Sequence, residues 1–244
     1  MILFPKGARK VAAKPVSIGI VLVFHTPPSI AAAGAYQSLA DRVVERNAKG
    51  EFIIPGSQLK GKLRHACEQL LRALGKEICS PPRAETMCPP GLGKPCLLCQ
   101  VFGGPAYPSP LKFGDLVLDL GGKGLHPRQA APSRRAMIGI NRRRATVAEG
   151  RLFLVEAAPH FPTLRFANEE AITGTLDNFA QVRLLLAGLR LIPAWGGMKS
   201  RGLGWIGRKV QEGRMKVEVE VSALFDGNSV KVDDWQEVRE LWSG

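Results

Sequence analysis

The sequence predicts an α+β protein with a ferredoxin-like core. Alternating apolar residues predict strands, and apolar residues at helical spacing predict helices at residues 57–74 and 178–191. Without two long irregular segments, the elements follow an order close to βαββαβ, the ferredoxin-like arrangement. A chain of 244 residues can bury a substantial core. We therefore expect a single domain over residues 1–244, with inserts at residues 76–110 and 121–150.

The first predicted strand covers residues 15–24, where bulky apolar residues occupy every second position. It ends before Pro27, which cannot continue a central ladder. Residues 39–52 are typical of a hairpin with its turn at residues 47–50. This hairpin leads into the first helix.

The first helix has clear signals at both ends. Pro55 and Gly56 break the extended run, and Ser57 is the expected N-cap because its hydroxyl can accept from a first-turn amide. Gly75 ends the pattern. The predicted buried face consists of Leu59, Leu63, Ala66, Cys67, Leu70, Leu71 and Leu74.

The charges of this helix are unusual. Lys60, Lys62 and Arg64 crowd the positive end of the helix dipole, where acidic residues are normally favoured. One interpretation is a solvated basic face. The other is an anion site, in which free amides, the dipole and side-chain charge meet a phosphate.

Four cysteines lie in the first insert, which is also rich in proline. Cys79, Cys88, Cys96 and Cys99 are separated by eight, seven and two residues. The closely spaced last pair is a good half-site for one tetrahedral ion, so we predict structural zinc. Free thiols are the alternative, and a redox pair is less favoured because no thioredoxin-like strand precedes it. Cys67 is expected to be a small core residue.

The second insert, residues 121–150, is glycine-rich at its start and strongly basic. Met137, Ile138 and Ile140 are apolar residues among its arginines, which suits a projecting hairpin better than a core element. Around it we predict strands at residues 113–120, 151–157, 163–166, 205–210 and 215–224, a glycine-rich basic loop at 196–204, and a short helix at 233–242.

The net charge of +13 and the pI near 9.9 indicate a polyanionic partner, most commonly nucleic acid. An anionic membrane is a weaker candidate because the basic segments are not amphipathic. No apolar run reaches the roughly 18 residues that span a bilayer. The start of the chain lacks a signal-peptide core, so we expect a cytoplasmic protein.

Two motifs resemble a known family. Residues 54–64 (IPGSQLKGKLR) look like the IPGSSLKGxLR signature of the RAMP superfamily, and residues 196–204 (GGMKSRGLG) are similar to its C-terminal GGxxSRGxG loop. Weaker segments lie between them in the same order: Val101–Gly104, the strand from Phe113, and residues 140–153. Together they resemble the backbone subunit of type III (Csm/Cmr-type) CRISPR effector complexes.

The resemblance implies a modified RNA-recognition-type core that polymerises along CRISPR RNA. Its partners would be CRISPR RNA, target RNA, copies of itself and other effector subunits, with no membrane. A thumb at residues 121–150 would wedge the guide–target duplex through Met137 and Ile138. The expected RNA-binding residues are Ser57, Lys60, Lys62, Arg64, Gly197, Lys199, Ser200 and Arg201.

The resemblance also implies an aspartate upstream of the first motif that is needed to cut target RNA. Asp41 lies 14 residues before Pro55 and matches that place. Its carboxylate can help to hold Mg²⁺ or Mn²⁺, or orient the ribose 2′-hydroxyl for in-line attack, which leaves a 2′,3′-cyclic phosphate. Alternatively, Asp41 merely caps a turn. The run of alanines before it departs from the family pattern.

Three other functions remain open at this stage. A noncatalytic backbone or capping subunit would share the same motifs. A stand-alone repeat-processing endoribonuclease would need a histidine near the first strand, and His25 is the only candidate. Composition alone also allows a zinc-stabilised basic protein that binds structured RNA.

Overall fold

The computed structural model describes residues 13–32, 40–81, 83–89, 94–120, 130–161, 164–211 and 214–230. The tail predicted at residues 233–242 and the glycine-rich start of the basic insert lie outside this part of the chain. The main elements are β1 (Lys14–Phe24), β2 (Ile53–Ile54), α1 (Gly56–Ala73), α2 (Leu97–Phe102), β3 (Leu111–Phe113), β4 (Leu116–Asp119), β5 (Ser133–Asn141), β6 (Thr146–Ala157), β7 (Leu164–Leu176), α3 (Phe179–Leu191), β8 (Arg208–Gln211), β9 (Arg214–Val217), β10 (Val219–Phe225) and β11 (Asn228–Ser229).

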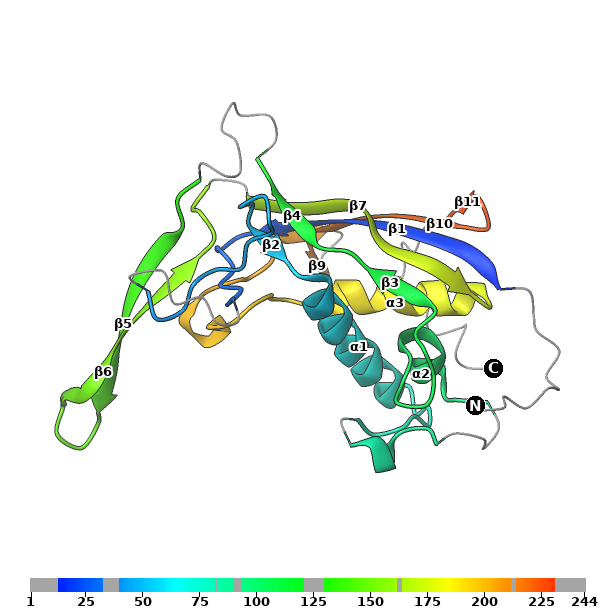
Figure 1. Cartoon of the computed structure of the whole chain (residues 1–244), viewed down its shortest axis with the longest axis horizontal. Coiled ribbons are helices and arrows are strands. Elements are labelled where there is room, and N and C mark those ends of the chain that lie inside the picture. Colours follow the sequence, from blue (N-terminus) through cyan, green and yellow to red (C-terminus); the bar gives the residue numbers. More distant parts are fainter. Residues whose placement is uncertain are drawn as a thin grey trace.

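One antiparallel sheet forms the centre of the molecule, and α1 and α3 lie on the same side of it (Figure 1). The order of its four main strands is β10-β1-β7-β4. Helix α1 lies in the connection from β1 to β4, and β7 lies between these two strands in the sheet. Helix α3 lies in the connection from β7 to β10, and β1 lies between those two strands. This split βαβ arrangement is that of a ferredoxin-like sheet, so the predicted mixed α/β core is confirmed.

Alternate residues of β1, from Val16 to Phe24, are buried, as the sequence pattern predicted. The two helices approach closely where a Cβ on Gly188 of α3 would lie 2.6 Å from the Cys67 sulfur of α1. Cys67 contacts the Leu184 carbonyl at 3.5 Å, and burial raises the pKa of its thiol. Cys67 is therefore a core residue.

The strands around β7 differ from the prediction. The strand predicted over residues 113–120 is broken by Gly114 and Asp115 into β3 and β4. Strand β7 has 13 residues, whereas the sequence indicated only residues 163–166. A register shift opposite Gly19 interrupts its pairing with β1 and hides the alternation that would have revealed the strand.

Strands β5 and β6 form a separate hairpin that projects from the sheet (Figure 1). A projecting hairpin was predicted for the basic insert, but its second strand continues to Ala157, so the predicted strand at residues 151–157 belongs to it. Asn141 caps the turn by accepting from the amides of Arg143 and Arg144. Within the described residues, no helix has the length and apolar character needed to cross a membrane.

Candidate nucleic-acid interface and metal site

Helix α1 begins at Gly56, with Pro55 as its N-cap and no side-chain cap from its own sequence. The expectation that Ser57 is the N-cap is therefore wrong, and Ser57 is exposed. Asp115 takes that role, because its Oδ1 accepts from the Gly56 amide at 2.8 Å. Glycine is required at position 56, since a Cβ would lie 2.2 Å from the Phe113 carbonyl oxygen.

Asp115 is itself held by the irregular part of β7. The Asn168 side chain donates to the Asp115 carbonyl at 2.8 Å and accepts from the Glu170 amide at 2.8 Å. This chain of hydrogen bonds fixes the start of α1 on the sheet. It also places a carboxylate at the positive end of the helix dipole, so one amide expected to meet a phosphate already has an anionic partner.

The three basic residues in the first half of α1 point to different neighbours. The Lys60 ammonium lies 5.7 Å from the centroid of the Phe113 ring. Lys62 donates to the Ala194 carbonyl at 3.1 Å and lies 5.8 Å from the Trp195 ring centroid. Burial, followed by the charge of Lys199, lowers the pKa of Lys62. Lys62 therefore connects the first motif to the residues that lead into the glycine-rich loop.

Arg64 faces the cysteine-rich segment. Its Nη1 donates to the Gly103 carbonyl at 2.7 Å, and its Nη2 lies 3.9 Å from the Cys99 sulfur. The role of Arg64 in RNA binding stays a prediction.

The glycine-rich loop folds back on itself through glycines with positive φ. Gly204 has φ of +72°, and a Cβ there would lie 1.9 Å from the Trp195 carbonyl oxygen. Gly196 has φ of +81° and packs against the Ser29 backbone. The Gly197 amide donates to the Ser29 carbonyl at 2.8 Å, so it is not free for a phosphate. Lys199–Arg201 form an exposed single turn at the top of the loop.

Arg201 joins this loop to the base of the β5–β6 hairpin. Its Nη1 lies 3.0 Å from the Met137 sulfur and 3.6 Å from the Met198 sulfur, and its guanidinium is 5.6 Å from the Phe153 ring centroid. Met137 is only 9% exposed. The small core at this junction contains Met137, Val155, Ala157 and Leu203.

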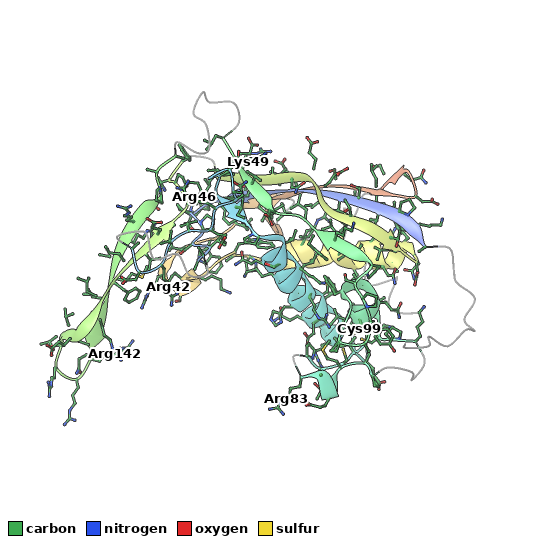
Figure 2. All side chains as sticks on the ribbon, viewed as in Figure 1. Arg42, Arg46, Lys49, Arg83, Cys99 and Arg142 are labelled. Atoms are coloured by element: carbon green, nitrogen blue, oxygen red, sulfur yellow. The ribbon has the colours of Figure 1, made fainter. Side chains whose placement is uncertain are left out.

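The opposite face of the hairpin is apolar and exposed. Ile138 pairs with Leu152, and Ile140 pairs with Val147. These four side chains are 47%, 67%, 63% and 55% exposed, in that order. Arginines occupy the tip, where Figure 2 labels Arg142. Ile138 therefore lies on an exposed surface and Met137 does not, while a wedge role for either is a prediction.

Asp41 lies where the hairpin meets the body of the protein. Its Oδ2 accepts from the Leu154 amide at 2.7 Å. Arg42 continues the pairing, since its amide donates to Leu154 and its carbonyl accepts from Glu156. Asp41 is exposed. Its carboxylate thus has a structural bond through Oδ2, and among the residues that the structure describes no hydrogen bond or ion pair involves its second oxygen.

Glu156 is a buried charged residue beside the candidate site that the sequence did not single out. Its carboxylate accepts from Arg134 at 3.2 Å and from the Val44 amide at 3.4 Å. The one signal in the sequence is that Glu156 is a charged residue at the end of an otherwise apolar strand segment. It fastens the segment after Asp41 to the hairpin.

The four predicted cysteine ligands come together. Their sulfur atoms all lie within 4.8 Å of one another, and the Cys79 sulfur lies 3.4 Å from that of Cys99 and 3.6 Å from that of Cys96. Tetrahedral zinc with Zn–S bonds of 2.3 Å separates its sulfurs by about 3.8 Å. The four cysteines therefore fit structural zinc.

The thiols differ in their electrostatics: burial is the main cause that raises the pKa of Cys79 and Cys99, whereas the pKa of Cys96 is lowered. Burial acts to raise the pKa of Cys96, but hydrogen bonds from the Cys79 and Cys99 backbones and from neighbouring thiols outweigh it and lower the pKa to about 7. Cys96 is also the N-cap of α2. Among the described residues, these cysteines are the only group of three or more potential ligands that can hold a metal, so no such group surrounds Asp41.

The model of the RAMP superfamily matches residues 31–207, more than half of the chain. The match spans both motifs, the cysteine cluster and the hairpin. A comparison with curated proteins gave no match. The chain therefore belongs to the RAMP superfamily of CRISPR-associated RNA-binding proteins.

Proposed function

We propose that this chain is a CRISPR-RNA-binding backbone subunit of a type III effector complex. The observation that carries the proposal is the junction of Lys62 with the glycine-rich loop. Lys62 of the first motif donates to the Ala194 carbonyl, just before the second motif, and its charge interacts with that of Lys199 in the second motif, more than 130 residues away in the sequence. The two motifs form one surface, as a track for an RNA backbone requires.

The charges on this surface are available to phosphates. Among the described residues, none of the salt bridges involves Lys60, Lys62, Lys199 or Arg201. Lys62 and Lys199 lie close enough for their charges to oppose each other. A phosphate between them relieves this repulsion, so RNA binding and the stability of the surface support each other. Ser57 and Ser200 are exposed beside these cations and can donate to phosphate oxygens.

The hairpin is the proposed thumb. It combines arginines at its tip with an exposed apolar face along its strands, made of Ile138, Ile140, Val147 and Leu152. Cations hold a nucleic-acid backbone, while apolar side chains that enter a base step unstack it. The wedge we propose consists of Ile138 with Leu152 and Ile140, and Met137 supports it from the hairpin base.

Cleavage of target RNA is proposed to depend on Asp41. The oxygen not bonded to Leu154 can orient a ribose 2′-hydroxyl for in-line attack on the adjacent phosphate. The 2′-hydroxyl loses its proton to the Asp41 carboxylate and its oxygen bonds to phosphorus; the bond from phosphorus to the 5′-oxygen breaks, that oxygen takes up a proton from water, and a 2′,3′-cyclic phosphate remains. Since no three-ligand group surrounds Asp41 in the described residues, Mg²⁺ or Mn²⁺ bound there would take its other ligands from RNA and water.

A noncatalytic backbone or capping subunit is the second candidate. One observation favours it: the Asp41 carboxylate already accepts from the Leu154 amide and so has a structural role. Both candidates bind guide RNA through the same surface, and they differ only in cleavage.

Binding of single-stranded RNA at several salt concentrations tests the shared proposal. Lys62→Ala should weaken binding and reduce the slope of log K against log salt by about 0.7, the value for one lost phosphate contact on a single strand. Lys14→Ala is the control, because it removes an equal charge at the first residue of β1. The start of β1 lies at the end of the sheet away from the β5–β6 hairpin (Figure 1). Equal slopes for Lys62→Ala and the wild type would refute the RNA track.

A further inference from the structure

Helix α1 contacts both ends of the cysteine-rich segment. Arg64 contacts the Cys99 sulfur and the Gly103 carbonyl. Two turns later, the Arg72 Nη2 donates to the Cys79 carbonyl at 3.3 Å and to the Ser80 hydroxyl at 3.2 Å. Cys79 and Cys99 are the first and last of the four cysteines along the chain. One helix therefore holds both ends of the metal-binding segment.

The arrangement of the two arginines is specific. Arg64, Glu68 and Arg72 are spaced four residues apart and lie on one face of α1. Glu68 orients Arg72 by accepting from its Nε at 3.1 Å and its Nη2 at 3.0 Å. Gly103, which Arg64 contacts, is the C-cap of α2, the helix that carries Cys99. Arg64 thus contacts a candidate ligand and the end of the element that carries it.

The charge of a zinc–thiolate site explains why arginines contact it. A zinc ion with four thiolates has a net charge of −2, and this negative charge needs compensation where the site is partly buried. A guanidinium that donates to a thiolate supplies a positive charge in a fixed geometry. Figure 2 shows Cys99 beside α2 and next to α1.

We infer that Arg64 and Arg72 are positioning residues of the metal site, and that metal binding through them fixes α1 in its RNA-binding orientation. Arg64 belongs to the motif associated with RNA, yet its guanidinium serves the cysteines. Its charge also lowers the pKa of Lys60, after burial, so Lys60 and Arg64 are electrically coupled. The inference rests on the proposed metal site and, for its effect on α1, on the proposed RNA track.

Metal binding by purified variants tests the inference without RNA. Zn²⁺ competition against a chromophoric chelator should show that Arg64→Ala lowers affinity about 10- to 100-fold, with a smaller loss for Arg64→Lys and for Arg72→Ala. In Co²⁺-loaded protein, the thiolate-to-metal charge-transfer band should shift in Arg64→Ala at saturating metal, and Arg64→Lys should restore part of the shift. A purely structural role would not move this band.

Arg83→Ala is the matched control, because it removes one exposed arginine from the same segment. It should leave affinity and spectrum unchanged. Wild-type affinity and an unshifted Co²⁺ band in both Arg64 variants would overturn the inference, and so would a wild-type chain that binds neither metal. RNA affinity of the zinc-loaded wild type is measured separately: it should fall when a chelator removes zinc, whereas loss of RNA binding in both states would refute the RNA track instead.

Discussion

Single side chains from distant elements determine the local geometry of the interface. Asp115 caps α1, although it lies 59 residues after Gly56. Arg64 points to the cysteines, whereas Lys62, two residues earlier, points to the glycine-rich loop. Neighbours in one motif therefore serve different sites, and a motif does not assign one function to all its residues.

At the same scale, Asp41→Asn separates the two roles of Asp41. Asparagine keeps an oxygen that can accept from the Leu154 amide, but it removes the negative charge. If Asp41 acts in cleavage, Asp41→Asn should lower the cleavage rate of complementary RNA by at least about 100-fold in the assembled complex, while RNA affinity and melting temperature stay at wild-type values.

Asp41→Ala serves as the comparison, since it removes the structural bond as well. It should show the same loss of cleavage together with a destabilisation of about 1 kcal/mol. Wild-type cleavage by Asp41→Asn would remove the carboxylate from the mechanism and favour the noncatalytic candidate.

At the scale of elements, the β5–β6 hairpin has two faces with different tasks. One face contains Met137 and Val155 and packs on Leu203 of the glycine-rich loop. The other carries exposed Ile138 and Leu152. The hairpin is therefore anchored to the glycine-rich loop through one face, and its other face is exposed.

Unfolding measurements distinguish these faces. Met137→Ala should lower the free energy of unfolding by about 2 kcal/mol, because it removes a buried side chain. Ile138→Ala should change it by less than about 0.5 kcal/mol, since that side chain is exposed. Urea denaturation with hydrogen exchange on the hairpin gives both values.

The variant with the smaller effect on stability should have the larger effect on RNA. Ile138→Ala should disturb the pairing of target RNA with a bound guide, and should leave guide affinity unchanged. If Ile138→Ala were the more destabilising variant, the assignment of the two faces would be wrong.

For the molecule as a whole, the sequence predicted the elements whose apolar residues recur regularly. It missed the elements in which that regularity is interrupted. The alternation in β1 and the helical spacing in α1 appear directly in the buried residues. Strand β7 was largely missed because three successive polar residues, Asn168, Glu169 and Glu170, interrupt its alternation. They lie at the bulge in its pairing with β1. The cysteine cluster was predictable because metal ligands need only type and spacing.

The direction of side chains was not predictable. Ser57 has the chemistry of an N-cap, yet an aspartate from another segment takes the position, because tertiary packing brings Asp115 closer. The contact of Lys62 with the Ala194 carbonyl, just before the glycine-rich loop, joins segments more than 130 residues apart, and no local pattern marks it. Pattern thus predicts elements, whereas the fold decides which side chains meet.

In the whole molecule, the β5–β6 hairpin extends away from the central sheet (Figure 1). A projecting element with an exposed apolar face is suited to contact a neighbouring copy or the duplex that it covers, and such head-to-tail contacts do not close. The number of copies per RNA should therefore rise by one for each constant increment of RNA length in native mass spectrometry. Lys14→Ala should follow the same steps, and Lys62→Ala should need more protein to reach them. A dimer of constant size on every RNA would instead indicate a closed two-fold interface, and would contradict polymerisation along the guide.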